Sequence, residues 1–256
     1  MGFLYKKKIL IVGIYNKSSI AYGIAKSMYI QGANLAFTYK NHKLKEKIKV
    51  IAKKFNSKIF FRCNLKKDKN IKNLFLKLKN KWKNFDGIVH SIAYLNKKHL
   101  KRNYMNSITK NSFLKSHEIG SYSFISLAKH CYSLLNKNSS LLTISYLGSQ
   151  RCISNYNLMG SVKASLESNV RYMACDLGPK IRVNAISSGP IKTVSSYGIN
   201  NFKKLLFLNK IKSPIKRNIS INEIGNVAAF LISNLSSGIT GQTIYVDGGF
   251  NIVGVY

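Results

Sequence analysis

The stretch that decides the fold is KILIVGIYNKSSIAYGIA, residues 8–25. Its opening aliphatic run is typical of a parallel strand that is covered on both faces. Gly13 follows where the chain must turn, and Ser19 stands where a helix should begin. Ser19 could cap backbone N–H groups or bind a phosphate oxygen, because a helix N-terminus favours an anion. We expect Gly23 to let this helix pack closely on the sheet. The full G-x-G-x-x-G pattern is absent, so a phosphate loop and a plain strand, turn and helix both fit these residues.

Short apolar runs continue along the chain and alternate with segments of helical periodicity. The expected strands are Lys8–Gly13, Asn34–Tyr39, Lys58–Arg62, Gly87–Ser91, Leu141–Ser145, Arg182–Ser187 and Thr243–Val246. Helical patterns cover Ile71–Trp82 and Tyr122–Leu135, and Ser220–Glu223 predicts a capping box that opens a helix over Ile224–Ile232. This alternation predicts an α/β fold, a single-domain Rossmann-type doubly wound parallel sheet of about seven strands flanked by helices.

Length and composition favour one domain. The chain has 256 residues and only 3 prolines, and no linker interrupts it, so we expect residues 1–256 to form a single unit. No apolar run approaches the ~20 residues that a membrane span needs. The first residues lack the long apolar region and cleavage site of a signal peptide. We therefore expect a cytoplasmic protein without a membrane segment.

The charge is strongly basic, with 42 Lys+Arg against 8 Asp+Glu and a formal net charge of +34. Such a charge suggests a polyanionic partner such as nucleic acid. However, Lys, Asn and Ile are all abundant and are spread along the whole chain, which favours compositional drift over a dedicated nucleic-acid surface. An acidic protein partner would still be attracted to this surface.

Neither a metal site nor a disulfide framework is indicated. Four cysteines are scattered without a C-x-x-C pair, so reduced thiols are expected. The histidines lack metal-ligand spacing, and the acidic residues are dispersed, so we predict no metal. We expect His90, at a strand end, to be packed and hydrogen-bonded rather than catalytic.

One tyrosine and one lysine share a spacing that suits oxyanion chemistry. Tyr156 and Lys163 are seven positions apart, which is two helical turns, so we expect both on one helical face. The lysine could hold ribose hydroxyls, favour an oxyanion near the phenol and lower the tyrosine pKa. An ordinary amphipathic helix fits the same two residues.

The segment after the second expected strand bears on the cofactor. NAD-selective sites often place Asp or Glu there to bind the adenosine ribose. Here the sequence is YKNHK at residues 39–43, and Lys40 with Lys43 could meet a 2′-phosphate instead. Two solvated lysines in a lysine-rich chain explain the pattern more simply, so NADH and NADPH both stay open.

Segments along the whole chain resemble the bacterial enoyl-acyl-carrier-protein reductases, a divergent branch of the short-chain dehydrogenase/reductase superfamily. The resemblance is carried by SIAYGIA at 19–25, FTY at 37–39, FDGIVHSI at 85–92, SYLG at 145–148, NYN at 155–157, KASLE at 163–167, RVNAIS at 182–187 and VDGGF at 246–250. Ordinary superfamily members place the lysine four residues after the tyrosine. Gly160 stands there in this sequence, which separates it from ketoacyl reductases and sugar dehydrogenases.

The resemblance implies an NADH-dependent enzyme, with NADPH not excluded, that reduces the trans-2 double bond of enoyl thioesters in fatty-acid elongation. It implies catalytic roles for Tyr146, Tyr156 and Lys163, and substrate contacts for Leu95, Tyr146 and Tyr156. The implied cofactor-binding residues are Gly13, Ser19, Ile20, Lys40, Asn64, Leu65, Ile92, Lys163, Ile191, Lys192, Thr193, Val194 and Ser195. Residues from 195 to about 210 resemble a mobile substrate lid.

Partners and departures also follow from the resemblance. It implies a homotetramer and a substrate carried by an acidic acyl carrier protein, which would suit the lysines around the lid at 203, 204, 210 and 212. Lys40 replaces an expected glutamine, and Asn64 replaces an aspartate that usually meets the adenine. Ala93 replaces a glycine and slightly narrows the nicotinamide pocket. Whether Tyr156 transfers a proton or only donates a hydrogen bond stays open at this stage.

Overall fold

The computed structural model describes residues 2–94, 103–194, 196 and 201–254. All seven of its strands form one parallel sheet in the order β3-β2-β1-β4-β5-β6-β7. The strands are β1 (Lys8–Val12), β2 (Asn34–Tyr39), β3 (Phe60–Arg62), β4 (Phe85–His90), β5 (Leu135–Tyr146), β6 (Ile181–Ser188) and β7 (Thr243–Val246). The strand order reverses at β1, because β2 and β3 extend the sheet on one side and β4 to β7 on the other. The predicted doubly wound parallel sheet is confirmed.

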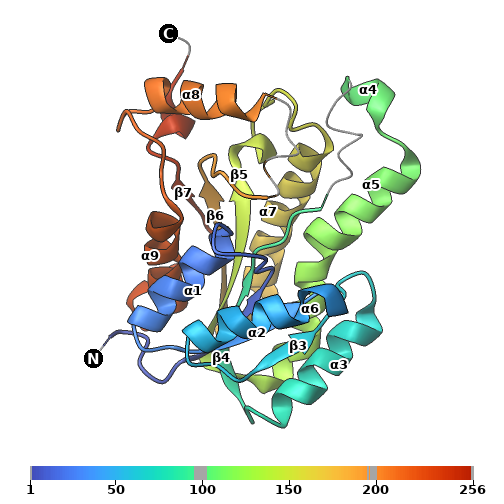
Figure 1. Cartoon of the computed structure of the whole chain (residues 1–256), viewed down its shortest axis with the longest axis vertical. Coiled ribbons are helices and arrows are strands. Elements are labelled where there is room, and N and C mark those ends of the chain that lie inside the picture. The colour runs from blue at the N-terminus through green and yellow to red at the C-terminus, as the bar shows by residue number, and fades with distance from the viewer. Residues whose placement is uncertain (1, 95–102, 195, 197–200, 255–256) are drawn as a thin grey trace.

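Helices cover both faces of the sheet (Figure 1). The helices of the described residues are α1 (Ile20–Ile30), α2 (Lys45–Lys54), α3 (Asp68–Lys79), α4 (Tyr104–Ser107), α5 (Lys110–His117), α6 (Ser123–Cys131), α7 (Leu158–Leu177), α8 (Phe202–Lys212) and α9 (Ile221–Ile232). A π-helical turn, Glu118–Tyr122, joins α5 to α6. The predicted capping box of α9 is present, with the Ser220 hydroxyl and the Glu223 carboxylate each accepting from the other residue's backbone N–H.

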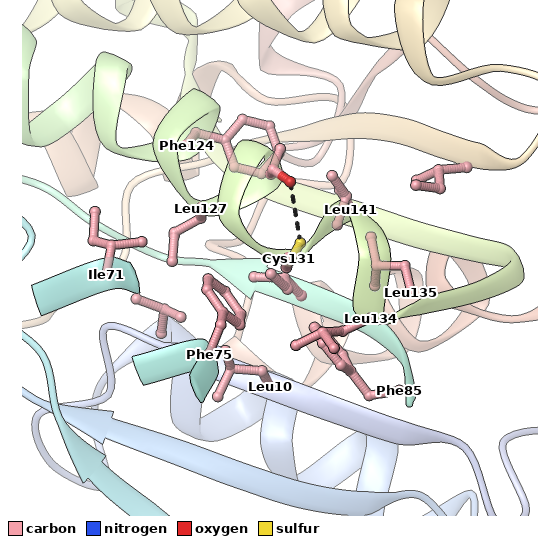
Figure 2. Packing of buried hydrophobic residues seen from close by; sticks show 14 of the residues in the cluster. Leu10, Ile71, Phe75, Phe85, Phe124, Leu127, Cys131, Leu134, Leu135 and Leu141 are labelled. Carbon is pink, nitrogen blue, oxygen red and sulfur yellow. Dashed lines mark hydrogen bonds between the residues drawn. The ribbon is translucent and has the colours of Figure 1, made fainter. Parts of the chain in front are cut away.

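Two hydrophobic clusters form the core, one on each face of the sheet. Successive residues of β1 alternate between them, as a strand covered on both faces requires. Ile9 and Ile11 pack with α1, α2 and α9, whereas Leu10 and Val12 pack with α3, α6 and α7. Figure 2 shows part of the cluster that contains Leu10. In it the Cys131 thiol donates to the Ala128 carbonyl at 3.4 Å. Figure 1 shows α8 lying across one end of the molecule, apart from both of these layers.

The fifth strand is longer than predicted. It begins at Leu135 rather than Leu141, and the helix expected to reach Leu135 ends at Cys131. The sequence analysis missed this extension because residues 136–140 are polar (NKNSS), and polar residues argue against a buried strand. In the fold Ser139 and Ser140 are fully buried, and their hydroxyls donate to backbone carbonyls, including that of Leu231 at 2.9 Å. Hydrogen bonding therefore allows these polar side chains inside the core.

Boundaries elsewhere differ by up to three residues. The helix predicted to start at Ile71 begins at Asp68, whose carboxylate accepts from the hydroxyls of Tyr122 and Ser126 at 2.8 and 2.7 Å. The fourth strand begins at Phe85, two residues before its predicted start, and it ends at His90. Such end differences are ordinary for helices and strands.

Gly23 serves a helix contact rather than the predicted contact with the sheet. A Cβ built on Gly23 would lie 2.2 Å from the Ile221 carbonyl oxygen at the start of α9, and one on Gly225 would lie 2.5 Å from the Gly23 carbonyl oxygen. Helices α1 and α9 therefore touch through their backbones. This contact brings the N-terminus of α1 and the chain before α9 to the same end of the sheet.

Within the described part of the chain, no helix combines the length and the apolar character needed to cross a membrane.

We expect Gly23→Ala to destabilise the protein by about 1–3 kcal/mol, because the new methyl group would overlap the backbone of α9. This should lower the melting temperature by roughly 2–4 °C for each kcal/mol in a chain of this size. Gly238→Ala is the matched control, since a Cβ there would have no described atom within 4 Å. Circular dichroism melts of both variants check this prediction, and equal melting temperatures would contradict it.

Candidate functional site

A cavity of about 740 Å³ lies at the carboxyl ends of the strands. Its walls include residues at or just after five neighbouring strand ends, namely Gly13, Lys40, Ser91, Tyr146 and Ser188. Neighbouring strands are ~4.8 Å apart, so these five ends cover roughly 19 Å. The cavity is thus elongated across the topological switch point between β1 and β4, where open α/β sheets bind their ligands.

Gly13 lets the backbone pass closely at this switch point. Its φ of +106° lies in a region that side-chain-bearing residues rarely adopt. A Cβ there would lie 2.1 Å from the Ser91 carbonyl oxygen and 2.9 Å from Cδ1 of Ile92. Both the conformation and the close approach therefore require glycine, and they leave the backbone itself as the cavity wall.

The loop after Gly13 is held by one serine. The Ser19 hydroxyl accepts from the backbone N–H groups of Tyr15 and Asn16 at 3.2 and 3.0 Å, and it donates to Oδ1 of Asn16. It forms no side-chain cap with the first turn of α1. The sequence left capping and phosphate binding open for Ser19. In the fold this hydroxyl shapes the loop while the N-terminus of α1 faces the cavity that Ser19 and Ile20 line.

Tyr156 and Lys163 line the same cavity. The prediction that both lie on one helix is wrong. Helix α7 begins at Leu158, so Lys163 is helical and Tyr156 lies in the turn before it. Asn155 and Asn157 flank the tyrosine with φ values of 63° and 45°. Asparagine is among the few residues that tolerate positive φ, which explains how NYN holds a turn here.

Lys163 is a buried cation, only 4% exposed. Its Nζ donates to the carbonyl oxygen of Ile144 at 2.7 Å and to that of Ile92 at 3.2 Å. Burial lowers the pKa of Lys163 to about 8, and the nearby Glu167 partly opposes this shift. The side chain therefore points from α7 to the ends of β4 and β5.

Glu167, one turn further along α7, is an equally buried carboxylate at 4% exposure. It accepts from the hydroxyls of Ser145, at the end of β5, and Ser149, the second at 2.6 Å. These two bonds fix the carboxylate beneath the catalytic residues implied by the resemblance. Sequence reasoning placed no role on Glu167.

The two tyrosines pack against each other, with ring centroids 4.7 Å apart and planes at 59°. Gly148 makes room for them, since a Cβ there would lie 2.4 Å from Cδ1 of Tyr156. Desolvation raises the pKa of Tyr156, and Tyr146 and Glu167 raise it further. The predicted lowering of this pKa is therefore wrong, because burial, the neighbouring tyrosine and the carboxylate all raise it. Desolvation, followed by Asp247, also raises the pKa of Tyr146.

Gly160 explains why the lysine stands further along than in ordinary members of the superfamily. A Cβ at this position would lie 2.7 Å from the Gly148 carbonyl oxygen. The start of α7 thus touches the loop after β5 directly, and no side chain fits between them. A lysine four residues after Tyr156 would need that space.

Most of the predicted site residues line the cavity. They are Gly13, Ser19, Ile20, Lys40, Asn64, Leu65, Ile92, Tyr146, Tyr156, Lys163, Ile191, Thr193 and Val194. Lys192 instead lines an adjacent hollow of about 350 Å³ beside α9. Leu95 and Ser195 lie outside the described residues. Thr193 and Ser196 hydrogen-bond to each other, and the Thr193 N–H donates to the Ser196 hydroxyl at 2.8 Å.

Several lining residues were missed by the sequence analysis. Near the tyrosines an apolar wall is formed by Ile119, Met159, Phe202 and Leu205. Ile119 belongs to the π-helical turn, which has no local sequence signal but often occurs at functional sites. Phe202 and Leu205 lie in α8, inside the segment that resembles a lid. Lys66 and Tyr94 were also missed at the opposite end.

His90 is packed and hydrogen-bonded, as predicted. It is fully buried, with Nδ1 2.8 Å from the Thr143 hydroxyl and Nε2 2.9 Å from the Ser123 hydroxyl. Burial, helped by Lys163, lowers the pKa of His90 to about 3, so the ring stays neutral. Among the described residues, no three His, Cys, Asp or Glu side chains form a group that could hold a metal ion.

Comparisons with known proteins agree with this geometry. Residues 13–251 match the family model described as Enoyl-(Acyl carrier protein) reductase. The enoyl-(acyl-carrier-protein) reductase (NADH) FabI of Buchnera aphidicola subsp. Schizaphis graminum is 57% identical over 256 residues, covering 100% of this chain and 98% of that protein. The protein of the same name from Escherichia coli K12 is 50% identical over 253 residues, covering 98% and 97%.

The fold of a solved relative is nearly the same. The crystal structure of enoyl-(acyl-carrier-protein) reductase (NADH) from Aquifex aeolicus VF5 covers 100% of both chains, with a TM-score of 0.97 and 40% identity. The family match extends over nearly the whole sequence, and the curated relatives align from end to end. The chain, whose candidate site is the cavity across the switch point with its two tyrosines and its buried lysine, thus belongs to the enoyl-(acyl carrier protein) reductase family.

Proposed function

We infer that the chain is an NADH-dependent enoyl-acyl-carrier-protein reductase, which reduces the trans-2 double bond of enoyl thioesters in fatty-acid elongation. The observation that carries this function is the convergence of Tyr146, Tyr156 and Lys163 on one end of an elongated cavity. The full-length relatives named for this activity support it. In this proposal the whole chain is one domain, located in the cytoplasm and assembled as a homotetramer.

The residues present fit a nicotinamide dinucleotide. The cavity volume lies in the range of roughly 300–1,000 Å³ that is usual for ligand sites, and Gly13 opens the backbone where a pyrophosphate needs close approach. The N-terminus of α1 offers its dipole and N–H groups to an anion. In this assignment Gly13, Ser19 and Ile20 meet the pyrophosphate, Lys163 meets the nicotinamide ribose, and the nicotinamide is surrounded by Ile92, Ile191, Thr193 and Val194.

The reaction is a conjugate addition in which the bound reduced nicotinamide supplies the hydride. As the β-carbon of the enoyl thioester gains that hydride, the π electrons shift and negative charge develops on the thioester oxygen. Tyr156 donates a hydrogen bond to this enolate oxygen, and the Lys163 ammonium adds a favourable positive potential. A proton then adds to the α-carbon to complete the saturated product. A fixed donor in a desolvated site stabilises such an oxyanion strongly.

The surroundings of Tyr156 favour hydrogen bonding over outright proton transfer. Desolvation and Glu167 both raise the pKa of Tyr156, so its hydroxyl stays protonated at neutral pH and is a weak acid. A phenol that keeps its proton can donate a hydrogen bond in every turnover and does not have to be reprotonated between turnovers. The proton for the α-carbon then comes from solvent after the hydride step.

The acyl chain and its carrier belong at the end of the cavity under α8. Phe202 and Leu205 line the cavity from this helix, beside Met159 and Ile119. The same helix has lysines at 203, 204, 210 and 212. An acidic carrier protein would be attracted to this basic helix while its thioester arm enters along the apolar wall. In this proposal the substrate lid is the segment from 195 to about 210, of which Ser195 and residues 197–200 lie outside the described residues.

The purified chain should oxidise NADH when a trans-2-enoyl-coenzyme A is supplied, which the loss of reduced-nicotinamide absorbance measures. A 3-ketoacyl thioester should leave NADH unchanged, which separates this activity from that of a ketoacyl reductase. Oxidation with the ketoacyl thioester alone would contradict the proposed function.

Salt-dependent gel shifts with DNA and RNA test the nucleic-acid alternative raised by the net charge of +34.

Tyr156→Phe should lower kcat roughly a hundredfold, because it removes the oxyanion donor. The dissociation constant for NADH should change little, because the ring remains in place. Lys163→Ala should instead weaken NADH binding, since it removes the side chain assigned to the ribose. Calorimetric titration and steady-state kinetics of the two variants check this division. Equal loss of NADH affinity in both would contradict it.

The activity should fall as the pH rises through about 8, because the Lys163 ammonium loses its proton there. Below this pH the amine is charged and attracts the developing oxyanion, and above it the attraction is lost. The pH profile of kcat/KM for NADH reports this group in the free enzyme. Glu167→Gln removes a charge that raises the Lys163 pKa, so the fall should move to lower pH.

Glu46→Gln is the matched control for this pH shift. Glu46 lies on the exposed surface of α2, where its carboxylate pairs with the Lys49 amine at 3.6 Å. The substitution Glu46→Gln removes the same charge far from Lys163, so the pH profile of this variant should match that of the unmodified enzyme. A Glu167→Gln profile that also matches would show that the carboxylate does not act on Lys163.

A further inference from the structure

The cavity walls have charge of one sign only. Its charged lining residues are Lys40, Lys43, Lys66 and Lys163, and among the described residues no carboxylate lines it. Lys163 serves the catalytic end. The other three lie at the opposite end, where Lys40 and Lys43 follow β2 and Lys66 follows β3. The end of the cavity that lies farthest from the tyrosines therefore has three amines.

Two of these amines converge on one aromatic ring. The Nζ atom of Lys40 lies 5.7 Å from the centroid of the Tyr94 ring, and that of Lys66 lies 5.4 Å from the same centroid. Tyr94 itself lines the cavity just after β4. The ring thus gathers two cations at the cavity wall, where each can be drawn to a common ligand.

These cations lack acidic partners on the described part of the chain. None of the ion pairs found there involves Lys40, Lys43 or Lys66. Partial burial lowers the pKa of Lys66, and the neighbouring Lys115 and Lys40 lower it further, while Glu118 opposes the shift. The amines repel one another, so an anion placed between them would be stabilised.

The position of this cluster specifies the anion. In dinucleotide-binding sheets the residue after the second strand meets the 2′ position of the adenosine ribose, and a carboxylate there selects the free hydroxyl. Lys40 holds this place, and the first acidic residue beyond it, Glu46, lies on α2 in its exposed pair with Lys49. A ribose phosphate would accept charge-assisted hydrogen bonds from the three amines.

We propose that Lys40, Lys43 and Lys66 form a subsite for a phosphate on the adenosine 2′ oxygen, so that this enzyme takes NADPH as well as NADH. The proposal rests on the proposed function for its placement of the dinucleotide. It assigns the cluster a ligand that the NADH-named relatives do not specify. Binding there is independent of the tyrosines, because the cluster lies at the far end of the cavity.

The direct test is calorimetric titration of the intact protein with two mononucleotides, adenosine 2′,5′-bisphosphate and 5′-AMP. We expect the bisphosphate to bind about tenfold more tightly at low ionic strength, through charge-assisted bonds to its 2′-phosphate. This advantage should shrink at about 1 M salt, where charges are screened beyond ~3 Å. Equal affinities at low salt would overturn the proposal.

Variants separate the cluster from the overall basic charge. The triple change Lys40→Gln, Lys43→Gln and Lys66→Gln should abolish the preference for the bisphosphate, and Lys66→Gln alone should reduce it roughly twofold to fivefold. Lys53→Gln, on the exposed side of α2, removes the same charge outside the cavity and is the control. If Lys53→Gln weakens the preference as much as Lys66→Gln, general attraction explains it and the subsite is refuted.

Kinetics with both cofactors distinguish this proposal from the proposed function. We expect the enoyl thioester to be reduced with NADH and NADPH, and the triple variant to raise the ratio of KM for NADPH to KM for NADH about tenfold. Activity with NADH but not with NADPH refutes only the subsite. Loss of enoyl reduction with both cofactors, while the bisphosphate still binds preferentially, refutes the proposed function and keeps the subsite.

Discussion

The buried Lys163 ammonium is the constraint around which the site is built. A charged amine at 4% exposure is tolerated only if its hydrogens find acceptors, and here they reach the carbonyl oxygens of Ile144 and Ile92. These carbonyls lie at the ends of two neighbouring strands, so the bonds fix α7 against the sheet. Glu167 stands one helical turn away and binds the end of β5 through Ser145. These bonds thus fix the position of α7 and of both charged side chains relative to the strand ends. They also position Tyr156, because its turn leads directly into α7.

Close backbone approaches shape the space around this amine. Gly13 lets β1 pass against the residue after β4, Gly148 leaves room for the Tyr156 ring, and Gly160 brings α7 onto the Gly148 carbonyl. Each of these contacts would be blocked by a single methyl group. The cavity therefore owes its form as much to missing side chains as to the residues that line it. An all-lysine set of charges within such walls suits phosphate groups at one end of the cavity and a substrate oxygen that becomes negatively charged at the other.

Much of the architecture could be read from local patterns. The aliphatic runs and their turns predicted the parallel sheet and all seven strands, and Ser220 with Glu223 predicted the cap of α9, because both signals depend on neighbours in sequence. The beginning of β5 was missed because its serines are buried with their hydroxyls bonded to distant carbonyls. Gly23 was assigned to the wrong neighbour, since only the packed fold places Ile221 against it. Ile119 and Phe202 were missed because a cavity wall is assembled from segments that share no pattern.

By itself the sequence determined the fold class and the family resemblance, since residue type and spacing suffice for these, and the resemblance in turn singled out the two tyrosines and the lysine. Only the tertiary structure decided that Tyr156 precedes its helix, that its pKa is raised rather than lowered, and that Lys66 and Tyr94 join Lys40 at the far end of the cavity. The reason is physical. Desolvation and Coulomb interactions depend on which groups surround an atom in space, and those groups come from strands and helices that are far apart along the chain.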